Sequence, residues 1–299
     1  MINYEQKGDT VVVNGLNDFN IEQTLECGQC FRFFKVGELS YLIVALGRII
    51  NVSQAGNMIT FSPMTVPDFE NIWVRYFDLD KNYSEIKERL CKNDPIMQEA
   101  IAFADGIRIL NQEPLECLVT FIISQNKQIP HIKQIVNNMS ADYGEKIGEH
   151  FAFPTLDKLS SCNTEDFIRI KAGFRAKYIY DAAQKISSRF IDMEELTKMN
   201  TEKVKESLMM IKGVGPKVAD CTMLFSFERR EVFPVDVWVK RVMSHLYLGE
   251  QDVPLKEIHE FAKDKFGNYA GYAQQYLFHY ARAKKIGSIS SKFTPSLRK

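Results

Sequence analysis

Residues 9–62 and the residues from Asp68 onward follow two different hydrophobic patterns, and this change constrains the fold more than any other feature of the sequence. The first region alternates short apolar runs with turn residues, and the runs lie at 10–13, 31–36, 40–46, 48–53 and 58–62. Such runs predict β-strands, and the turn at 54–57 joins the last two as a hairpin. Helical periodicity follows at 68–77, 84–91, 114–125, 131–143 and 177–190. The sequence therefore predicts an α+β protein, with an N-terminal antiparallel β-sheet domain followed by a mostly α-helical domain.

The length and composition of the chain favour a globular protein with a large core. The 299 residues are 45% hydrophobic, which suits one large domain or two smaller ones. We expect a sheet domain with flanking helices over residues 1–112, a helical domain over 113–288 and a loose tail over 289–299. We see no internal repeat and no low-complexity linker.

The net charge, the lack of a membrane span and the lack of a signal-peptide pattern limit what the protein can bind and where in the cell it is expected. Because 38 basic residues balance 38 acidic ones, binding to nucleic acid requires a local basic surface. Candidates for that surface are Lys212, Arg229, Arg230, Lys240, Arg241 and residues 282–299. No run approaches the roughly 20 apolar residues of a membrane span, and the N-terminus lacks a signal-peptide pattern. We expect a cytoplasmic protein, nucleoid-associated if bacterial, that acts as a monomer and does not bind membranes.

A glycine-rich turn between two helical patterns is the first candidate for a binding site. Gly213 and Gly215 are expected to adopt backbone angles that other residues avoid, and Pro216 suits the first position of the following helix. This pattern predicts a helix, a tight hairpin and a second helix. Backbone N–H groups at such a helix start can hold a phosphate oxygen without reading a base. An ordinary helical turn is the alternative for these glycines alone.

Two residues near this hairpin carry groups that suit catalysis. Lys217 falls in the first turn of the second helix, where the helix dipole disfavours the charged form and so favours a nucleophilic amine. A solvated lysine, or one that contacts phosphate, is the alternative. Asp236 follows Pro234 and Val235 and precedes a helical pattern, so it is a good N-cap. A carboxylate fixed in this way could also stabilise a positive charge that develops on a sugar.

The segments around Lys217 and Asp236 resemble the helix-hairpin-helix glycosylase superfamily. Within that superfamily, the chain resembles the 8-oxoguanine DNA glycosylases and AP lyases of the eukaryotic type. The resemblance implies a sheet domain packed on two helical subdomains, with double-stranded DNA in the cleft between them. It also implies that Lys217 attacks C1′ of the flipped nucleotide, that Asp236 stabilises the sugar cation, and that β-elimination nicks the strand. A monofunctional glycosylase that uses activated water and a non-catalytic DNA-binding module are the alternatives.

Three further segments would form the base pocket by this resemblance. Residues 27–32 match the GQxFR segment of the family, in which the glycine carbonyl, here that of Gly28, accepts the N7–H of the oxidised base. Gln274 would bond the Watson–Crick edge and Phe278 would stack on the base, because residues four apart share a helix face. Cys221 would form the opposite wall. We expect Gln29 and Arg32 to be structural residues.

The six cysteines show no disulfide-rich spacing and are expected to be thiols. Cys27 and Cys30 have the spacing of a redox pair or half a zinc site, but no second pair or nearby histidine completes a metal site. Some family relatives carry an iron–sulfur cluster on cysteines that follow the helical domain. Because no cysteine follows Cys221, we expect no such cluster and no other cofactor. The carbonyls of the hairpin could hold a structural cation.

The resemblance also assigns residues that contact DNA. Asn126 would fill the gap left by the flipped base, Phe174 would be a second wedge, and Arg175 would contact the estranged cytosine. Taken alone, Asn126 is a common residue at helix ends and Arg175 a common solvated charge. His131 stands where the family has another cytosine-reading arginine, which predicts relaxed cytosine preference. Trp238 stands where the family has a phosphate-binding histidine, and Ala281 replaces an aspartate nearby.

Overall fold

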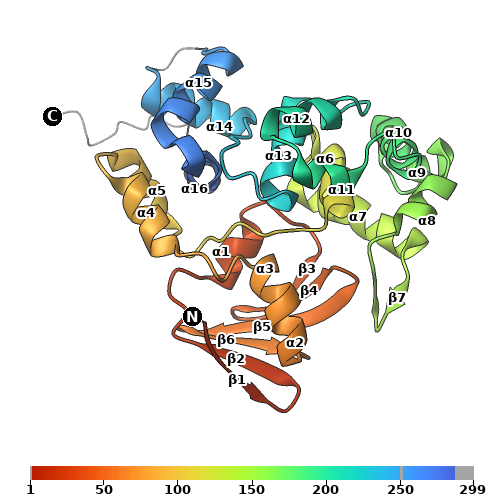
Figure 1. The fold of residues 1–299 in the computed structure, drawn as a ribbon, viewed down its shortest axis with the longest axis horizontal. Helices are drawn as coiled ribbons and strands as arrows, with labels where there is room; N and C mark the ends of the chain where they lie inside the picture. The colour runs from red at the N-terminus through yellow and green to blue at the C-terminus, as the bar shows by residue number, and fades with distance from the viewer. Residues whose placement is uncertain (1, 250–251, 287–299) are drawn as a thin grey trace. The chain divides into compact units, whose positions relative to one another are not determined.

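The computed structural model describes residues 2–249 and 252–286 and divides into two compact units. Unit 1 contains residues 1–81 and 106–229, and unit 2 contains residues 82–105 and 230–299. The N-terminal half of the chain therefore leaves unit 1 at residue 82, returns at residue 106, and contributes two helices to unit 2 (Figure 1). The domain boundaries predicted from the sequence follow chain order and remain a prediction. The predicted tail at 289–299 lies outside the described residues.

The predicted antiparallel sheet forms the N-terminal part of unit 1, and it has six strands, one more than the sequence predicted. Its order is β1-β2-β6-β5-β4-β3. The strands are β1 (Asn3–Lys7), β2 (Thr10–Asn14), β3 (Phe33–Gly37), β4 (Ser40–Ala45), β5 (Arg48–Ala55) and β6 (Met58–Ser62). Ala55 pairs with Met58, so Gly56 and Asn57 form a two-residue hairpin turn in which Gly56 has a φ of 59°. The fold class is thereby confirmed for the sheet.

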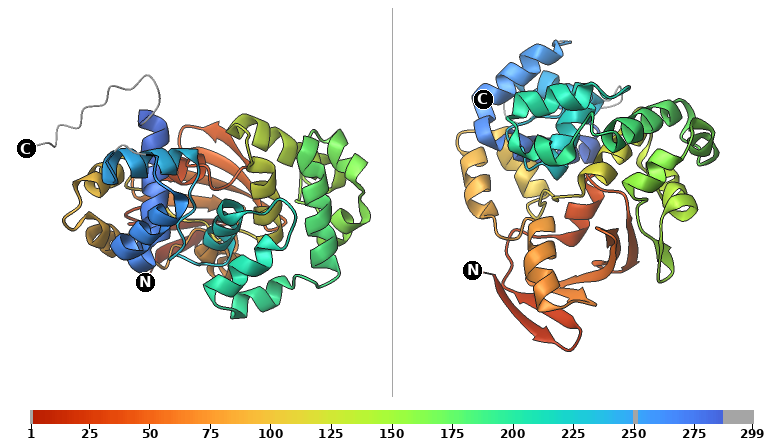
Figure 2. Two further views of the ribbon diagram at one scale, coloured as in Figure 1. Left: turned by 90° about the horizontal axis from the view of Figure 1, so that it is seen from above. Right: turned by 45° about the vertical axis from the view of Figure 1, so that its right-hand side comes forward.

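Aromatic side chains cover one face of this sheet. They come from the π-helical turn η1 (Phe69–Trp73), from α3 (Val74–Tyr76) and from Phe77 after it. Together with the preceding turn α2 (Val66–Asp68), these elements lie across the strands (Figures 1 and 2). The ring of Phe61 lies 5.4 Å from that of Phe69 and 5.6 Å from that of Phe77. The short helix α1 (Ile21–Glu26) adds Ile21 and Leu25 to the same core. This packing makes the sheet a rigid base for the turn that follows α1.

The remainder of unit 1 is helical and surrounds one buried helix. The helices are α6 (Pro114–Ser124), α7 (Ile129–Tyr143), α8 (Leu156–Ser161), α9 (Thr164–Arg169), η2 (Gly173–Arg175), α10 (Ala176–Ser187), α11 (Met193–Lys198), α12 (Thr201–Met209) and α13 (Pro216–Ser226). A short hairpin of β7 (Lys146–Ile147) and β8 (His150–Phe151) interrupts them. Eight residues of α6 are buried, because this helix is apolar on all sides and packs between α7, α10 and α13.

Unit 2 contains two segments of the chain that pack around one C-terminal helix. Its elements are α4 (Tyr83–Cys91), α5 (Pro95–Phe103), α14 (Val237–Val242), η3 (Met243–Tyr247), α15 (Leu255–Phe266), η4 (Gly267–Tyr269) and α16 (Ala270–Lys284). Helix α16 contacts α5, α14 and α15. Asp94 caps α5 and also accepts bonds from Tyr247 Oη at 3.1 Å and Lys265 Nζ at 3.0 Å. None of the helices in the described residues combines the length and apolarity that a membrane span requires.

Candidate active site

The predicted hairpin is present between α12 and α13, but its two glycines serve different purposes. Gly213 has a φ of 78°, and a Cβ there would lie 2.3 Å from Cδ2 of Tyr178, so only glycine fits. The expectation for Gly215 is wrong, because this residue is the N-cap of α13 and has an ordinary extended backbone with a φ of −98°. A side chain at Gly215 would meet open space. Pro216 begins α13, as predicted.

An ion pair joins the two helices of the hairpin. Lys205 Nζ on α12 lies 2.8 Å from Oδ1 of Asp220 on α13. Asp220 is 1% exposed, and this burial raises the pKa of its carboxyl, which Lys205 opposes. Because removing one partner of a buried pair leaves an uncompensated charge, the pair restricts how α13 can move against α12. The position of Lys217, in the first turn of α13, depends on this support.

Lys217 points toward α6 from the start of α13. Its Nζ donates to Oγ of Ser124 at 3.4 Å and lies 5.0 Å from the ring centroid of Phe121. The residue is half-buried. Phe121 stacks in turn on Phe225 of α13, at 5.5 Å between ring centroids. The amine is therefore held by the protein, as a nucleophile must be, and is not a freely solvated surface group.

The turn that carries Gly28 belongs to the same unit as Lys217 and is linked to it through aromatic rings. Gly28 follows α1 and has a φ of 85°. Three residues later, the ring of Phe31 packs edge-on against Phe121 at 6.2 Å. Phe121 thus contacts both the Lys217 amine and the segment of Gly28. No pattern in the sequence predicted that Phe121 and Ser124 contact the lysine.

Gln29 and Arg32 are buried structural residues, as expected. Gln29 is fully buried, and Arg32 is 6% exposed.

Cys27 and Cys30 are buried free thiols, so they form no disulfide, and burial raises the pKa of the Cys30 thiol well above its usual value. Cys221 is also buried, one turn after Lys217, and it raises the pKa of the Cys117 thiol, an effect second only to burial. This places Cys221 beside α6.

Three of the residues predicted to contact DNA, Asn126, Phe174 and Arg175, lie at the C-terminal end of α6. Asn126 follows α6, is exposed and adopts a left-handed conformation with a φ of 53°. Phe174 is 54% exposed. Arg175 is not the solvated charge that its residue type suggested, because it is 2% exposed and its Nε donates to the carbonyl of Gln125 at 2.9 Å. Its Nη2 also donates to the Asn126 carbonyl at 3.4 Å. Arg175 therefore braces the turn that presents Asn126.

Asp236 is the N-cap of α14 in unit 2, as predicted. Its Oδ1 accepts a hydrogen bond from the backbone N–H of Val239 at 2.8 Å, and the side chain is half-buried. Trp238 lies two residues later, with the guanidinium of Arg241 at 5.3 Å from its ring. Helix α14 packs on α16. One carboxylate oxygen is therefore committed to the helix, which fixes the orientation of the other.

Helix α16 carries the remaining predicted pocket residues. Gln274 is 5% exposed, and its Oε1 is buried with no hydrogen-bond partner among the described residues. Phe278 is half-buried, with the guanidinium of Arg282 at 5.3 Å from its ring. An unsatisfied buried acceptor costs about 1–3 kcal/mol. A bound group that donates a hydrogen bond to Gln274 would remove this cost.

His131 lies in the first turn of α7 and is exposed.

Within residues 2–249 and 252–286, no three histidine, cysteine or acidic side chains gather in a way that could hold a metal ion. Among the proposed basic residues, Arg229 is committed to the protein, since its Nη2 donates to the carbonyl of Met199 at 2.7 Å. Lys212 is exposed, with Nζ at 3.9 Å from the Asp181 carboxylate.

Two family models cover most of the chain. Residues 11–118 match the N-terminal domain of 8-oxoguanine DNA glycosylase, and residues 119–267 match the HhH-GPD superfamily of base excision DNA repair proteins. The solved structure of the Clostridium acetobutylicum 8-oxoguanine glycosylase/lyase in complex with DNA is 41% identical, with a TM-score of 0.91, over 96% of this chain and 99% of that one. The chain belongs to the 8-oxoguanine DNA glycosylase family.

Other members of the 8-oxoguanine DNA glycosylase family show the same likeness. The structure of MBOgg1 in complex with a low-affinity DNA ligand is 45% identical, with a TM-score of 0.92, over 95% of this chain and 99% of that one. The N-glycosylase/DNA lyase OGG1 of Arabidopsis thaliana is 29% identical over 87% of this chain and 77% of its own length. The likeness therefore extends well beyond the hairpin.

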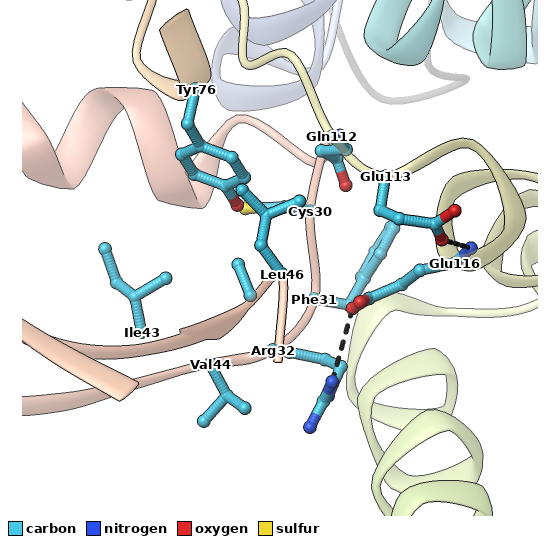
Figure 3. Close-up of a pocket in the computed structure, with 11 residues that line it drawn as sticks. Cys30, Phe31, Arg32, Ile43, Val44, Leu46, Tyr76, Gln112, Glu113 and Glu116 are labelled. Atoms are coloured by element: carbon cyan, nitrogen blue, oxygen red, sulfur yellow. Dashed lines mark hydrogen bonds and ion pairs between the residues drawn. The ribbon is translucent and has the colours of Figure 1, made fainter. Parts of the chain in front are cut away.

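In this 8-oxoguanine DNA glycosylase family member, two half-buried glutamates of α6 and its N-cap lie near Arg32, at the end of the segment that contains Gly28. Glu116 Oε1 lies 3.6 Å from Nη1 of Arg32, and Glu113 caps α6 by accepting from the N–H of Glu116 at 2.7 Å (Figure 3). Arg32 also donates to the carbonyl of Phe151. Burial raises the pKa of Glu113, and it raises that of Glu116 to about 7 despite the nearby Arg32.

The raised pKa of Glu116 predicts a pH-dependent stability. A carboxyl whose pKa is higher in the folded protein stabilises it fully below its unfolded value of 4.5, and this contribution is lost as the pH rises through about 7. Between pH 4.5 and pH 8, the unfolding free energy of the wild type should therefore fall by about 3 kcal/mol more than that of Glu116→Gln. Urea unfolding at several pH values measures this, with the exposed Glu195→Gln as a control. Parallel profiles for the wild type and Glu116→Gln would contradict it.

Proposed function

We propose that this protein removes 8-oxoguanine from double-stranded DNA and then nicks the abasic strand by β-elimination. The observation that carries the proposal is the position of Lys217. Its amine is held over Phe121, and Phe121 packs on Phe31 of the segment that contains Gly28. A nucleophile and a base-reading carbonyl are thus supported by one aromatic cluster. The family membership and the glycosylase/lyase names of the similar proteins support the same reaction.

Lys217 would provide the nucleophile. Its neutral amine attacks C1′ of the damaged nucleotide, the bond from C1′ to the base breaks, and the base leaves with that electron pair and takes up a proton. The sugar ring opens as the amine becomes a Schiff base, which makes a C2′ proton acidic. Loss of that proton breaks the C3′–O bond, and the phosphate leaves with the electron pair. Water then hydrolyses the Schiff base and restores the lysine.

Asp236 would stabilise the charge that develops on the sugar as the base leaves. Its Oδ1 is held by the Val239 N–H, so the carboxylate needs no reorganisation when the positive charge appears. The lysine and the carboxylate supply the nucleophile and the electrostatic stabilisation, so this chemistry calls for no cofactor.

The base would be recognised by its edges and its face. The Gly28 carbonyl would accept the N7–H, which 8-oxoguanine has and guanine lacks. Gln274 Oε1, buried and without a partner among the described residues, would accept from the Watson–Crick edge, and Phe278 would stack on the ring. A buried Gly28 carbonyl left without a donor would reject guanine. Cys221 would form the opposite wall.

The remaining predicted residues would hold the DNA. Asn126 and Phe174, both exposed beside the end of α6, would enter the duplex where the base has left. The backbone at Gly213 and Gly215 would contact phosphate, and Gly215 suits this because it begins α13 and a side chain there would meet nothing within 4 Å. Arg175 would support Asn126 and contact the estranged base. Trp238 would take the place of the phosphate-binding histidine. We expect a cytoplasmic monomer.

Borohydride trapping tests the proposal. The protein is incubated with a duplex that contains 8-oxoguanine opposite cytosine, with and without borohydride, and released base, nicked strand and protein–DNA adduct are measured. We expect all three, with the adduct mapped by mass spectrometry to the peptide that contains Lys217. Base release without an adduct would indicate catalysis by activated water. Binding without base release would indicate a non-catalytic DNA-binding protein.

His131 leads to a prediction about the opposite base. An imidazole ring has no bidentate fork of donors, whereas the family arginine presents a charged planar fork, so cytosine should be preferred less strongly. We expect excision opposite cytosine to exceed excision opposite adenine by less than about 100-fold, since a good contact to a base contributes about 1–3 kcal/mol. Single-turnover rates on the two duplexes measure the ratio, and His131→Arg should increase it. A wild-type ratio of several hundredfold would contradict the prediction.

A further inference from the structure

Gly28 lies in a turn that its own backbone does not hold in place. The residue has a φ of 85°, a conformation that glycine adopts freely but with little rigidity. Among the described residues, no donor forms a hydrogen bond to the Gly28 carbonyl. Selection of 8-oxoguanine over guanine depends on one N–H and therefore on the exact direction of this carbonyl. Some neighbouring group must fix it.

Gln29 is the neighbouring residue whose side chain is bound on every side. Its Nε2 donates to the carbonyls of Thr24 and Arg108, both at 2.7 Å. Its Oε1 accepts from the N–H of Leu110 at 2.9 Å. The side chain is fully buried. One amide therefore ties the end of α1 to the segment of residues 108–110, and Gly28 lies within the loop that this tie closes.

The same segment continues to the helix of Lys217. The Gln112 side chain donates to the backbone carbonyl of Gln29 at 2.8 Å, and the Gln112 N–H donates to the carbonyl of Phe225 on α13 at 2.7 Å. Lys217 begins α13. All of these residues belong to unit 1. Hydrogen bonds thus run from the turn of Gly28 through Gln29 and Gln112 to the helix of the nucleophile.

We propose that Gln29 is a positioning residue for base selectivity, which fixes the Gly28 carbonyl relative to Lys217 through residues 108–112. The proposal rests on the proposed function. It extends that function by assigning discrimination to a side chain that does not touch the base. Arg32 acts elsewhere, because it bonds Glu116 and the Phe151 carbonyl. Misplacing a recognition group by about 1 Å costs on the order of 100-fold in rate.

The test compares a reaction that needs the base with one that does not. Gln29→Met keeps the side-chain volume and removes all the amide bonds. We expect it to reduce single-turnover excision of 8-oxoguanine about 100-fold. Cleavage of a preformed abasic site uses Lys217 but no base, and we expect it to change less than about threefold, which is under 1 kcal/mol. Excision of guanine should not fall in parallel, so the ratio of the 8-oxoguanine rate to the guanine rate should drop.

Gln54→Met is the matched control, because Gln54 ties the start of α1 in the same way. Its Oε1 accepts from the Ile21 N–H at 2.8 Å and its Nε2 donates to the Phe19 carbonyl at 2.8 Å. We expect this variant to lose stability and to keep its selectivity. An equal loss of both activities in Gln29→Met, or no loss of excision, would overturn the proposal. A wild type that releases no 8-oxoguanine would instead overturn the proposed function.

Gln112→Met keeps the proposal testable if Gln29→Met does not fold. It removes one hydrogen bond to the Gln29 carbonyl from a half-buried side chain. Because one hydrogen bond contributes about 1 kcal/mol, we expect a loss of roughly fivefold in excision and no loss in abasic-site cleavage. Thermal unfolding of each variant sets the assay temperature below its transition. Equal effects on the two reactions in Gln112→Met would also overturn the proposal.

Discussion

Lys217→Gln is expected to lose the borohydride-trapped adduct and to reduce both base release and strand cleavage by at least about 10³-fold, since removing a catalytic nucleophile usually has effects of this size or larger. Glutamine is close in length and polar, but its amide nitrogen is not nucleophilic. The contact of Lys217 with Ser124 Oγ can be replaced by the amide, so we expect the fold to survive. Single-turnover assays and borohydride trapping measure the effect, and thermal unfolding checks the fold.

Lys212→Gln is the matched control for this prediction. Lys212 lies five residues earlier, and its side chain is 72% exposed. The Lys212→Gln substitution therefore removes the same charge from the same hairpin as Lys217→Gln. If the charge of the hairpin mattered chiefly for phosphate binding, the two variants would weaken DNA binding equally and retain similar chemistry. We expect Lys212→Gln to keep the adduct, with at most a salt-dependent loss of affinity. An adduct in Lys217→Gln that forms at the wild-type rate would rule out this lysine as the nucleophile.

The local patterns of the sequence predicted most of the fold because they act over a few residues. Strands β2 to β6 are short apolar runs separated by turn residues, and all five were expected where they lie. Strand β1 was not expected, because it is an edge strand of polar, mostly exposed residues with no apolar alternation. The predicted helix at 68–77 contains the π-helical turn η1. Its hydrophobic content is the same in either form, so the pattern could not distinguish them.

Some features of the candidate site depend on nearby residues, and the sequence predicted these; others depend on contacts between residues far apart in the sequence, and the sequence did not predict them. Pro216 at the helix start and Asp236 as an N-cap are local features, and the structure contains both. The burial of Arg175 depends on carbonyls 49 and 50 residues away, and the contact of Lys217 with Ser124 spans 93 residues. Such contacts arise only when α6, α10 and α13 pack together. The expectation for Gly215 failed because a glycine pattern does not reveal which glycine needs an unusual angle.

Asp236 combines a structural and a proposed chemical role, and these can be separated by two substitutions. As an N-cap, the side chain needs only an oxygen that accepts from Val239 N–H. Asparagine provides that oxygen and is as good an N-cap as aspartate, whereas alanine provides none and costs about 1 kcal/mol. The charge of the carboxylate is required only to stabilise the sugar cation. Asparagine therefore removes the proposed chemistry and keeps the cap.

We expect Asp236→Asn to unfold at nearly the wild-type temperature and to lose about 10²–10³-fold in base release, the usual effect of removing one electrostatic stabiliser. Asp236→Ala should show a similar loss of activity and, in addition, about 1 kcal/mol of lost stability. Cleavage of a preformed abasic site should fall less than base release, because no sugar cation forms in that reaction. If Asp236→Asn retained full base release, the carboxylate would be a helix cap alone, and the charge that stabilises the sugar would have to come from another group.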